Sequence, residues 1–300
     1  MSRKTFRLAF FAAGMLLGLV VGIFFSPSRP AAPQTFDGER AYQDVLYQMA
    51  LGPRLPGSES HAETRTWILK TLQDNGWQAE TVPAQAMGHD LYNLVGKRGE
   101  GRPWVILGAH YDNRLRADHD PHPEYRATPV PGANDGASGV AVLLELARTF
   151  PQREQPQIWL VFFDGEDNGE IPGWDWILGS RAFAQSLPSL PDAVVVVDMI
   201  GDADLNIYME QNSDPQVTRQ IWDTAASLGY EQYFIPQYKY RMLDDHIPFR
   251  QLGAPAVDLI DFDYPYWHTV EDTADKVSPR SLQVVGDTLL HWTLALAPED

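Results

Sequence analysis

Strand-like and helix-like stretches alternate along most of this chain, and this alternation limits the folds that it can adopt. Short apolar runs at residues 105–110, 158–163 and 193–199 have the length and composition of buried strands. Between them, apolar residues recur at the spacing of a helix face. Strands that are joined by helices lie parallel in one sheet, and the helices cover both of its faces. We therefore expect an α/β fold, a single domain with a mostly parallel central sheet flanked by helices.

The other elements follow from the same patterns. Helices are expected at residues 40–49, 61–75, 139–149, 176–186, 216–228, 245–252 and 278–296. Further strands are expected at residues 78–82, 91–95, 205–209, 233–235 and 256–260. Ser58 or Ser60 is placed to cap the second helix. The stretch 113–130 is polar and contains prolines, so we interpret it as a solvated loop.

The first 25 residues have a different character. Three basic residues precede an apolar run of 18 residues, from Leu8 to Phe25, and about 20 such residues span a bilayer. A cleaved signal peptide is the alternative, but no convincing cleavage site follows the run. We expect a signal anchor over residues 1–25, a proline-rich linker over 26–36 and a folded domain over 37–300. The basic end should stay in the cytoplasm, which makes this a single-pass protein of the cell membrane with its domain outside the cytoplasm.

Composition narrows the choice of partners. The net charge is −17, from 23 basic and 40 acidic residues, and such a surface repels the phosphates of nucleic acids. We expect no nucleic-acid partner, and we expect a monomer. The chain has no cysteine, so any metal ion must be held by carboxylate and imidazole groups.

Acidic and histidine side chains follow the predicted strands at their carboxyl ends, which is where α/β sheets place their sites. Asp135 stands in the glycine-rich stretch 132–139 between a strand and a helix, where it is either a helix cap or a ligand-binding group. The others are His110, Asp112, Asp164, Glu166, Asp167, Asp198, Asp261, Asp263 and His268. So many acids in one cleft would repel one another unless a divalent cation were bound. Oxygen and nitrogen donors without thiolate suit Zn²⁺, and Mn²⁺ or Co²⁺ are also compatible.

Several of these segments together resemble the zinc aminopeptidase family M28. They are His110-Tyr-Asp112, Asn134-Asp-Gly-Ala-Ser-Gly139, Phe163-Asp-Gly-Glu-Asp167, Asp198-Met-Ile-Gly201 and Trp267-His-Thr269. Within the family, the chain is similar to the glutaminyl-peptide cyclotransferases. The features that favour this branch are Asp244-Asp-His-Ile-Pro-Phe249, Trp267 before His268, and Trp174 followed by Leu178-Gly-Ser-Arg181. The resemblance covers about residues 38–297 and implies that residues 37–300 form a zinc-dependent catalytic domain.

The resemblance also implies roles for individual residues. Asp135, Asp167 and His268 would bind one zinc ion, and Glu166 would be the general base and acid. Asp198 and Asp244 would be hydrogen-bonded acids that support Glu166, while Trp174, Trp267 and Tyr264 would contact the substrate. Asp112 and Asp164 are expected to orient His110 and the loops without binding metal. One departure is the Glu166-Asp167 pair, because the animal cyclases have Glu-Glu and aspartate is one methylene shorter.

Three functions are compatible with these residues. The first is cyclisation of an N-terminal glutamine of a peptide to pyroglutamate, with release of ammonia. The second is an M28-type aminopeptidase with two zinc ions, in which His110 and Asp198 hold the second ion and Asp135 bridges the pair. The third is an anchored ectodomain that binds peptides without activity, which the intact Glu166 argues against.

Overall fold

The computed structural model describes residues 35–152 and 156–296. The predicted membrane segment and nearly all of the predicted linker lie outside these ranges, and both stay predictions. Within the described ranges, none of the helices combines the length and the apolar content needed to cross a bilayer. The hydrophobic core begins at Phe36, whose buried ring packs against Gly286 in the last helix.

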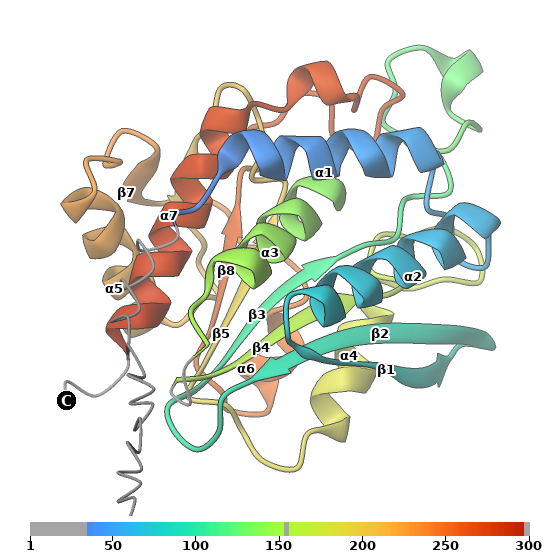
Figure 1. Cartoon of the computed structure of the whole chain (residues 1–300). Helices are drawn as coiled ribbons and strands as arrows, with labels where there is room; N and C mark the ends of the chain where they lie inside the picture. The colour runs from blue at the N-terminus through green and yellow to red at the C-terminus, as the bar shows by residue number, and fades with distance from the viewer. Residues whose placement is uncertain (1–34, 153–155, 297–300) are drawn as a thin grey trace, which may run out of the picture. The chain divides into compact units, whose positions relative to one another are not determined.

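A six-stranded sheet stands at the centre of the described structure, in the order β1-β2-β4-β3-β5-β8 (Figure 1). Its strands are β1 (Gln78–Ala86), β2 (His89–Arg98), β3 (Trp104–His110), β4 (Gln157–Phe163), β5 (Ala193–Asp198) and β8 (Ala256–Ile260). β3 pairs in parallel with β4 and β5, and β5 pairs in parallel with β8. β2 pairs antiparallel with both β1 and β4.

The sheet is therefore mixed, and the expectation of a mostly parallel sheet holds only for the half from β4 to β8. β1 and β2 are joined by just Met87 and Gly88, which have φ angles of 52° and 86°. Two residues can join only antiparallel strands, because a parallel pair needs a longer crossover. Both predicted strands are present, but β1 and β2 are not separated by a helix and so do not pair in parallel.

Helices cover both faces of the sheet (Figure 1). α1 (Gly38–Leu51), α2 (Glu59–Asp74), α3 (Ala137–Thr149) and α7 (Pro279–Ala295) cover one face, and α4 (Leu178–Ser186) and α6 (Ile247–Gln251) cover the other. β3 is buried along its whole length, and its side chains alternate between the two cores. Val105 and Leu107 pack under α3, whereas Ile106 packs with Phe183 and Phe249.

The remaining elements complete the fold beside this sheet. α5 (Pro215–Ser227) packs on α7, next to the short parallel pair of β6 (Ile207–Met209) and β7 (Phe234–Tyr238). Two 3₁₀ turns, η1 (Pro123–Tyr125) and η2 (Ala274–Lys276), lie in loops. The predicted cap of α2 is confirmed, since the Ser58 side chain accepts a hydrogen bond from the backbone N–H of His61.

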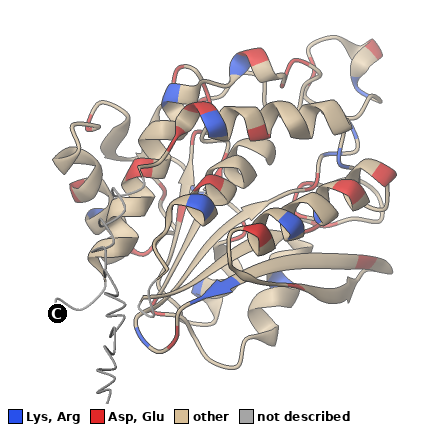
Figure 2. Ribbon diagram, in the orientation of Figure 1, with Lys and Arg blue, Asp and Glu red and all other residues tan. Residues whose placement is uncertain are grey.

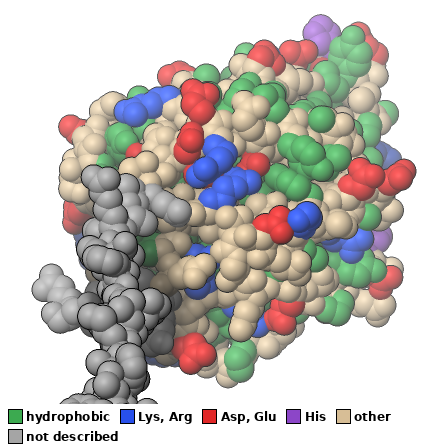
Figure 3. Space-filling view, viewed as in Figure 1, with side chains coloured by type: hydrophobic (Ala, Val, Ile, Leu, Met, Phe, Trp, Pro, Cys, Tyr) green, Lys and Arg blue, Asp and Glu red, His purple; other side chains and the backbone are tan. Residues whose placement is uncertain are grey.

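Charged residues are spread over the outer helices (Figure 2), and on the face shown in Figure 3 both signs are interspersed with apolar side chains. Some of these charges are paired inside the fold. Arg148 of α3 binds both carboxylate oxygens of Asp44 in α1, with N–O distances of 2.5 and 3.1 Å. Arg40 of α1 binds the buried Glu145 of α3 at 2.6 and 2.7 Å. These pairs fix α1 to α3.

Candidate active site

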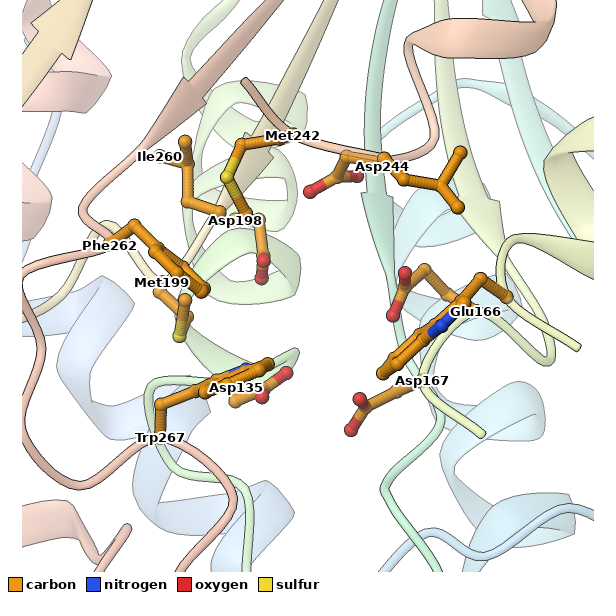
Figure 4. Close-up of a pocket in the computed structure, with 12 residues that line it drawn as sticks. Asp135, Glu166, Asp167, Asp198, Met199, Met242, Asp244, Ile260, Phe262 and Trp267 are labelled. Carbon is orange, nitrogen blue, oxygen red and sulfur yellow. The ribbon is translucent and has the colours of Figure 1, made fainter. Parts of the chain in front are cut away.

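A pocket lies where β3, β4, β5 and β8 end, and it combines carboxylates with apolar walls (Figure 4). Its volume is about 180 Å³, less than the roughly 300–1,000 Å³ of sites for drug-sized ligands. It is lined by Asp135, Glu166, Asp167, Trp176, Asp198, Met199, Met242, Leu243, Asp244, Ile260, Phe262 and Trp267. A space of this size suits a single side chain with its neighbouring backbone.

Asp135 is a pocket residue and not a helix cap. The N-cap of α3 is Gly136, at φ 89°, and no side chain caps this helix. A Cβ on Gly136 would stand 3.0 Å from Cε1 of His110, so glycine allows the strand end and the helix start to approach. The backbone N–H of Asp135 donates to Asp272 at 3.1 Å. The Asp135 carboxylate itself is directed into the pocket (Figure 4).

Asp135, Asp167 and His268 come together as the resemblance implied. Their donor atoms lie within 4.8 Å of one another. Nε2 of His268 is 2.8 Å from Oδ1 of Asp167 and 3.6 Å from Oδ2 of Asp135. The second oxygen of Asp167 is buried and has no hydrogen-bond partner among the described residues. This donor set fits Zn²⁺, and the shorter Asp167 still brings a carboxylate oxygen into the group despite the departure from Glu-Glu.

A second group of donors shares Asp135. Nε2 of His110 is 3.0 Å from Oδ1 of Asp135 and 3.2 Å from Oδ1 of Asp198, and the three donor atoms also lie within 4.8 Å of one another. The two oxygens of Asp135 therefore face two different histidines. This is the arrangement that a bridging carboxylate between two metal ions requires.

Asp112 and Asp164 hold the loop after β4, in line with the role expected for them. Asp112 accepts hydrogen bonds from the backbone N–H groups of Glu166 at 3.0 Å and Asp167 at 3.4 Å. Asp164 binds His61 at 2.9 Å and the backbone N–H of Tyr92 at 2.7 Å. Both acids therefore position this loop through its backbone and its neighbours.

Burial controls the protonation of the pocket. Burial raises the pKa of Glu166 well above its usual range, and the charges of Asp167 and Asp244 raise it further. Burial, with the charge of Asp198, raises the pKa of Asp244 to about 7. Burial also lowers the pKa of His268 to about 3, so its ring is neutral, which is the form that binds metal.

The comparisons with known proteins agree with this geometry. A family model described as Peptidase family M28 matches residues 93–293, which include both donor groups. The chain belongs to peptidase family M28.

Relatives of this M28 protein point to one branch of the family. It is 26% identical over 299 residues to a protein of Drosophila melanogaster named glutaminyl-peptide cyclotransferase, covering 85% of this chain and 81% of the relative. A solved structure of Porphyromonas gingivalis glutaminyl cyclase has a TM-score of 0.83 and 31% identity, over 88% of this chain and 100% of that one. A Zn-dependent exopeptidase from Parabacteroides distasonis has a TM-score of 0.82 and 30% identity, over 87% and 98%. The predicted resemblance to M28 proteins of the cyclotransferase branch is confirmed.

The structure corrects two of the predicted substrate contacts of this M28 protein. Trp174 is not among the residues that line the pocket, and its ring stacks on His89, with ring centroids 3.6 Å apart. Tyr264 is buried, and its hydroxyl donates to Asp272 at 2.7 Å. The wall is formed by Trp176, whose ring fills the space in which Gly169 lacks a side chain.

Other wall residues were also missed at the sequence level. Met199 and Ile260 each stand at the end of a strand that the sequence predicts, so strand position alone could have identified them. Met242 and Leu243 come from the irregular segment before α6, and no periodic pattern marks them. Trp267 lines the pocket as expected.

Exchanging the two tryptophans for alanine one at a time tests the corrected wall. We expect Trp176→Ala to lower kcat/KM by roughly 10–100-fold, because burying an aromatic ring against a ligand contributes on the order of 1.5–3 kcal/mol. Trp174→Ala, the matched control two residues away, should change kcat/KM only a few-fold. Steady-state kinetics on both variants measure this, and the opposite ranking would restore Trp174 as the wall.

Asp261, another predicted strand-end acid, is not among the residues that line the pocket. Its carboxylate accepts hydrogen bonds from the backbone N–H groups of Asn206 at 2.7 Å and Asp263 at 3.1 Å. Burial nevertheless raises its pKa to about 7. Asp261 is therefore a structural acid that keeps its proton in the folded protein at mildly acidic pH.

This shift predicts a pH dependence of stability. Between pH about 4 and about 7, folded Asp261 binds a proton that the unfolded chain has released, so its contribution is full below pH 4 and is lost as the pH rises to 7. The upper limit is about 4 kcal/mol, at 1.36 kcal/mol per pKa unit. Asp261→Asn should reduce the fall in the free energy of unfolding between pH 4.5 and 7.5, measured by urea denaturation. Identical slopes for the variant and the wild type would show that Asp261 is ionised when folded.

Proposed function

We propose that this M28 protein is a zinc-dependent glutaminyl-peptide cyclotransferase, which converts the N-terminal glutamine of peptides to pyroglutamate and releases ammonia. The observation that carries the proposal is the carboxyl group of Asp244, which lines the pocket beside Glu166 and Asp198. By resemblance, M28 aminopeptidases tend to carry serine at this position. The similarity to the Drosophila glutaminyl-peptide cyclotransferase and to the Porphyromonas glutaminyl cyclase supports the same function.

The donors fit one zinc ion held by Asp135, Asp167 and His268. When bound there, zinc would polarise the carbonyl of the substrate's side-chain amide as a Lewis acid. The substrate supplies its own nucleophile, so the pocket needs only to orient it. The small volume and the rings of Trp176 and Trp267 suit this task.

Glu166 would move the proton. As the α-amine nitrogen attacks the amide carbon of the glutamine side chain, Glu166 takes one proton from the amine. It then gives a proton to the departing nitrogen, so that a new C–N bond closes the ring, the old C–N bond breaks and ammonia leaves. A carboxyl group serves both steps best when its pKa lies near the working pH, and the burial of Glu166 raises its pKa in that direction. Asp198 and Asp244 would accept hydrogen bonds from the amine and tune Glu166.

The second candidate is hydrolysis of N-terminal residues by a two-zinc aminopeptidase. The group of His110, Asp135 and Asp198 favours it, because it could hold a second ion with Asp135 as the bridge. In that case Glu166 would activate a water molecule instead of the substrate amine. Leucine derivatives would then be substrates. A cyclotransferase cannot act on them, because a leucine side chain has no amide carbon that the α-amine could attack.

Metal content and substrate choice, measured on one preparation, separate the two functions. We expect one tightly bound zinc ion per chain in protein purified without added metal, release of ammonia from a peptide with N-terminal glutamine, and no cleavage of leucine anilide. Elemental analysis and the two assays check this. Two zinc ions, both needed for cleavage of leucine anilide, would establish the aminopeptidase instead.

A further inference from the structure

Arg114 is a charged side chain buried directly beneath the candidate metal ligands, outside the pocket itself. It is 1% exposed, and a charge that deep in a protein is costly unless it is fully paired. Nε and Nη2 donate to the two oxygens of Asp118 at 2.7 and 2.6 Å. Nη1 donates to the backbone carbonyl of Asp167 at 2.9 Å. The guanidinium group also lies over the ring of Trp176, 4.9 Å from its centre.

Asp118, whose two carboxylate oxygens both accept hydrogen bonds from Arg114, faces His268, another of the three candidate ligands. Its Oδ1 lies 3.8 Å from Nδ1 of His268, on the side of the ring away from Asp135 and Asp167. Nδ1 is buried and has no hydrogen-bond partner within the described ranges. A histidine that binds metal through Nε2 carries its proton on Nδ1, and such a proton is usually donated to a carboxylate or a carbonyl oxygen.

The backbone at His268 increases the need for such support. Its φ is 55°, in the left-handed region that non-glycine residues rarely adopt. No helix or strand contains His268, so its ring depends on neighbouring side chains for its orientation. The backbone N–H of His119 donates to the His268 carbonyl at 3.2 Å, which ties this ligand to the same loop that carries Asp118.

We propose that Arg114 and Asp118 are positioning residues for the zinc site, a role that rests on the proposed zinc ligands. Arg114 fixes one ligand by binding the Asp167 backbone and orients the other by directing Asp118 at Nδ1 of His268. This holds His268 in the tautomer whose Nε2 is free to bind metal. Because the same guanidinium packs on Trp176, one side chain sets the spacing between two metal ligands and the pocket wall. Neither residue lines the pocket.

Zinc affinity tests the proposal independently of turnover. Competition with a chromophoric chelator should show zinc binding that is roughly 10–100-fold weaker in Asp118→Asn, the usual cost of losing the partner of a ligating histidine. Asp118 is about one-third exposed, so this variant should fold. Arg114→Met should lose a similar factor and also raise KM, because Trp176 loses its support. The double variant should lose about as much as Arg114→Met alone, since Asp118 is oriented by Arg114.

The pair Arg148 and Asp44 provides the matched control. It is a two-contact arginine–aspartate pair of the same chemistry between α1 and α3. Arg148→Met and Asp44→Asn should lower Tm but leave zinc affinity unchanged. Wild-type zinc affinity in Asp118→Asn, or equal losses of affinity in the control variants, would overturn the positioning role.

Failure of the proposed function would look different. If zinc affinity depends on Asp118 and Asp167 but glutamine peptides are not cyclised, the positioning role stands and the assigned reaction falls. If Asp167→Asn binds zinc as tightly as the wild type, the ligand assignment is wrong and the positioning role falls with it.

Discussion

Glu166→Gln is expected to lower kcat by roughly 10²–10⁴-fold, the usual contribution of general acid–base catalysis, and to leave the zinc content unchanged. Glutamine keeps the size and shape of the side chain but cannot accept and return a proton. The backbone N–H of Glu166 is held by Asp112 at 3.0 Å, so the substituted side chain should stay in place. Steady-state kinetics on a glutamine peptide and elemental analysis of the same sample measure the two quantities.

Asp112 fixes the backbone of Glu166 and Asp167 alike, so a change in the loop as a whole would affect both residues. A loss of zinc in Glu166→Gln would therefore show either that Glu166 is itself a ligand or that the loop has moved. If Asp167→Asn retained its zinc in the same series, Glu166 would be the metal ligand. Asp167 would then be the general base in its place.

The second large effect is expected at Asp167. Asp167→Asn should weaken zinc binding by more than the roughly 100-fold that loss of an outer partner can cost, because a neutral amide replaces a charged ligand. Excess zinc in the assay should restore part of the activity. Two observations support this expectation. One oxygen of Asp167 is buried and lacks a hydrogen-bond partner among the described residues, and the other lies 2.8 Å from Nε2 of His268. Zinc affinity by chelator competition and activity as a function of added zinc provide the measurement.

Asp164→Asn is the control for this variant. Asp164 is a buried acid at the start of the same loop, but its carboxylate binds His61 and not the group of Asp135, Asp167 and His268. It should cost stability but leave zinc affinity within a few-fold of the wild type. Equal losses of affinity in both variants would indicate a general collapse of the loop.

The convergence of the strand-end acids could be predicted because these acids are tied to local patterns. Asp135, Asp167 and Asp198 each stand next to a strand or helix whose apolar periodicity is clear, and a parallel sheet brings such ends to one edge. The orientation of β1 and β2 was not visible in the same way, because it depends on a two-residue connection and not on the strands themselves.

What could not be predicted depends on contacts between irregular segments. Trp174 and Trp176 stand in the same loop, and only packing against His89 and Gly169 separates their directions. Asp118 belongs to a stretch that its polar composition marked as a solvated loop, yet its carboxylate binds the buried Arg114. Single-residue properties do not encode such pairings, since both partners are distant in the sequence from the groups that they support.

One part of the pocket wall stands on a different kind of element from Asp135 and Asp198, and this has a consequence for how proteins on this fold can diverge. Asp135 and Asp198 leave elements that are locked into the sheet and its core, whereas Met242 and Leu243 come from a partly exposed loop segment. Substitutions in such loops cost little stability, while substitutions at the sheet edge disturb the core. Selection for a new substrate can therefore act on this part of the wall through single tolerated steps without loss of the candidate metal ligands. A family built in this way can acquire new substrates faster than it acquires new chemistry.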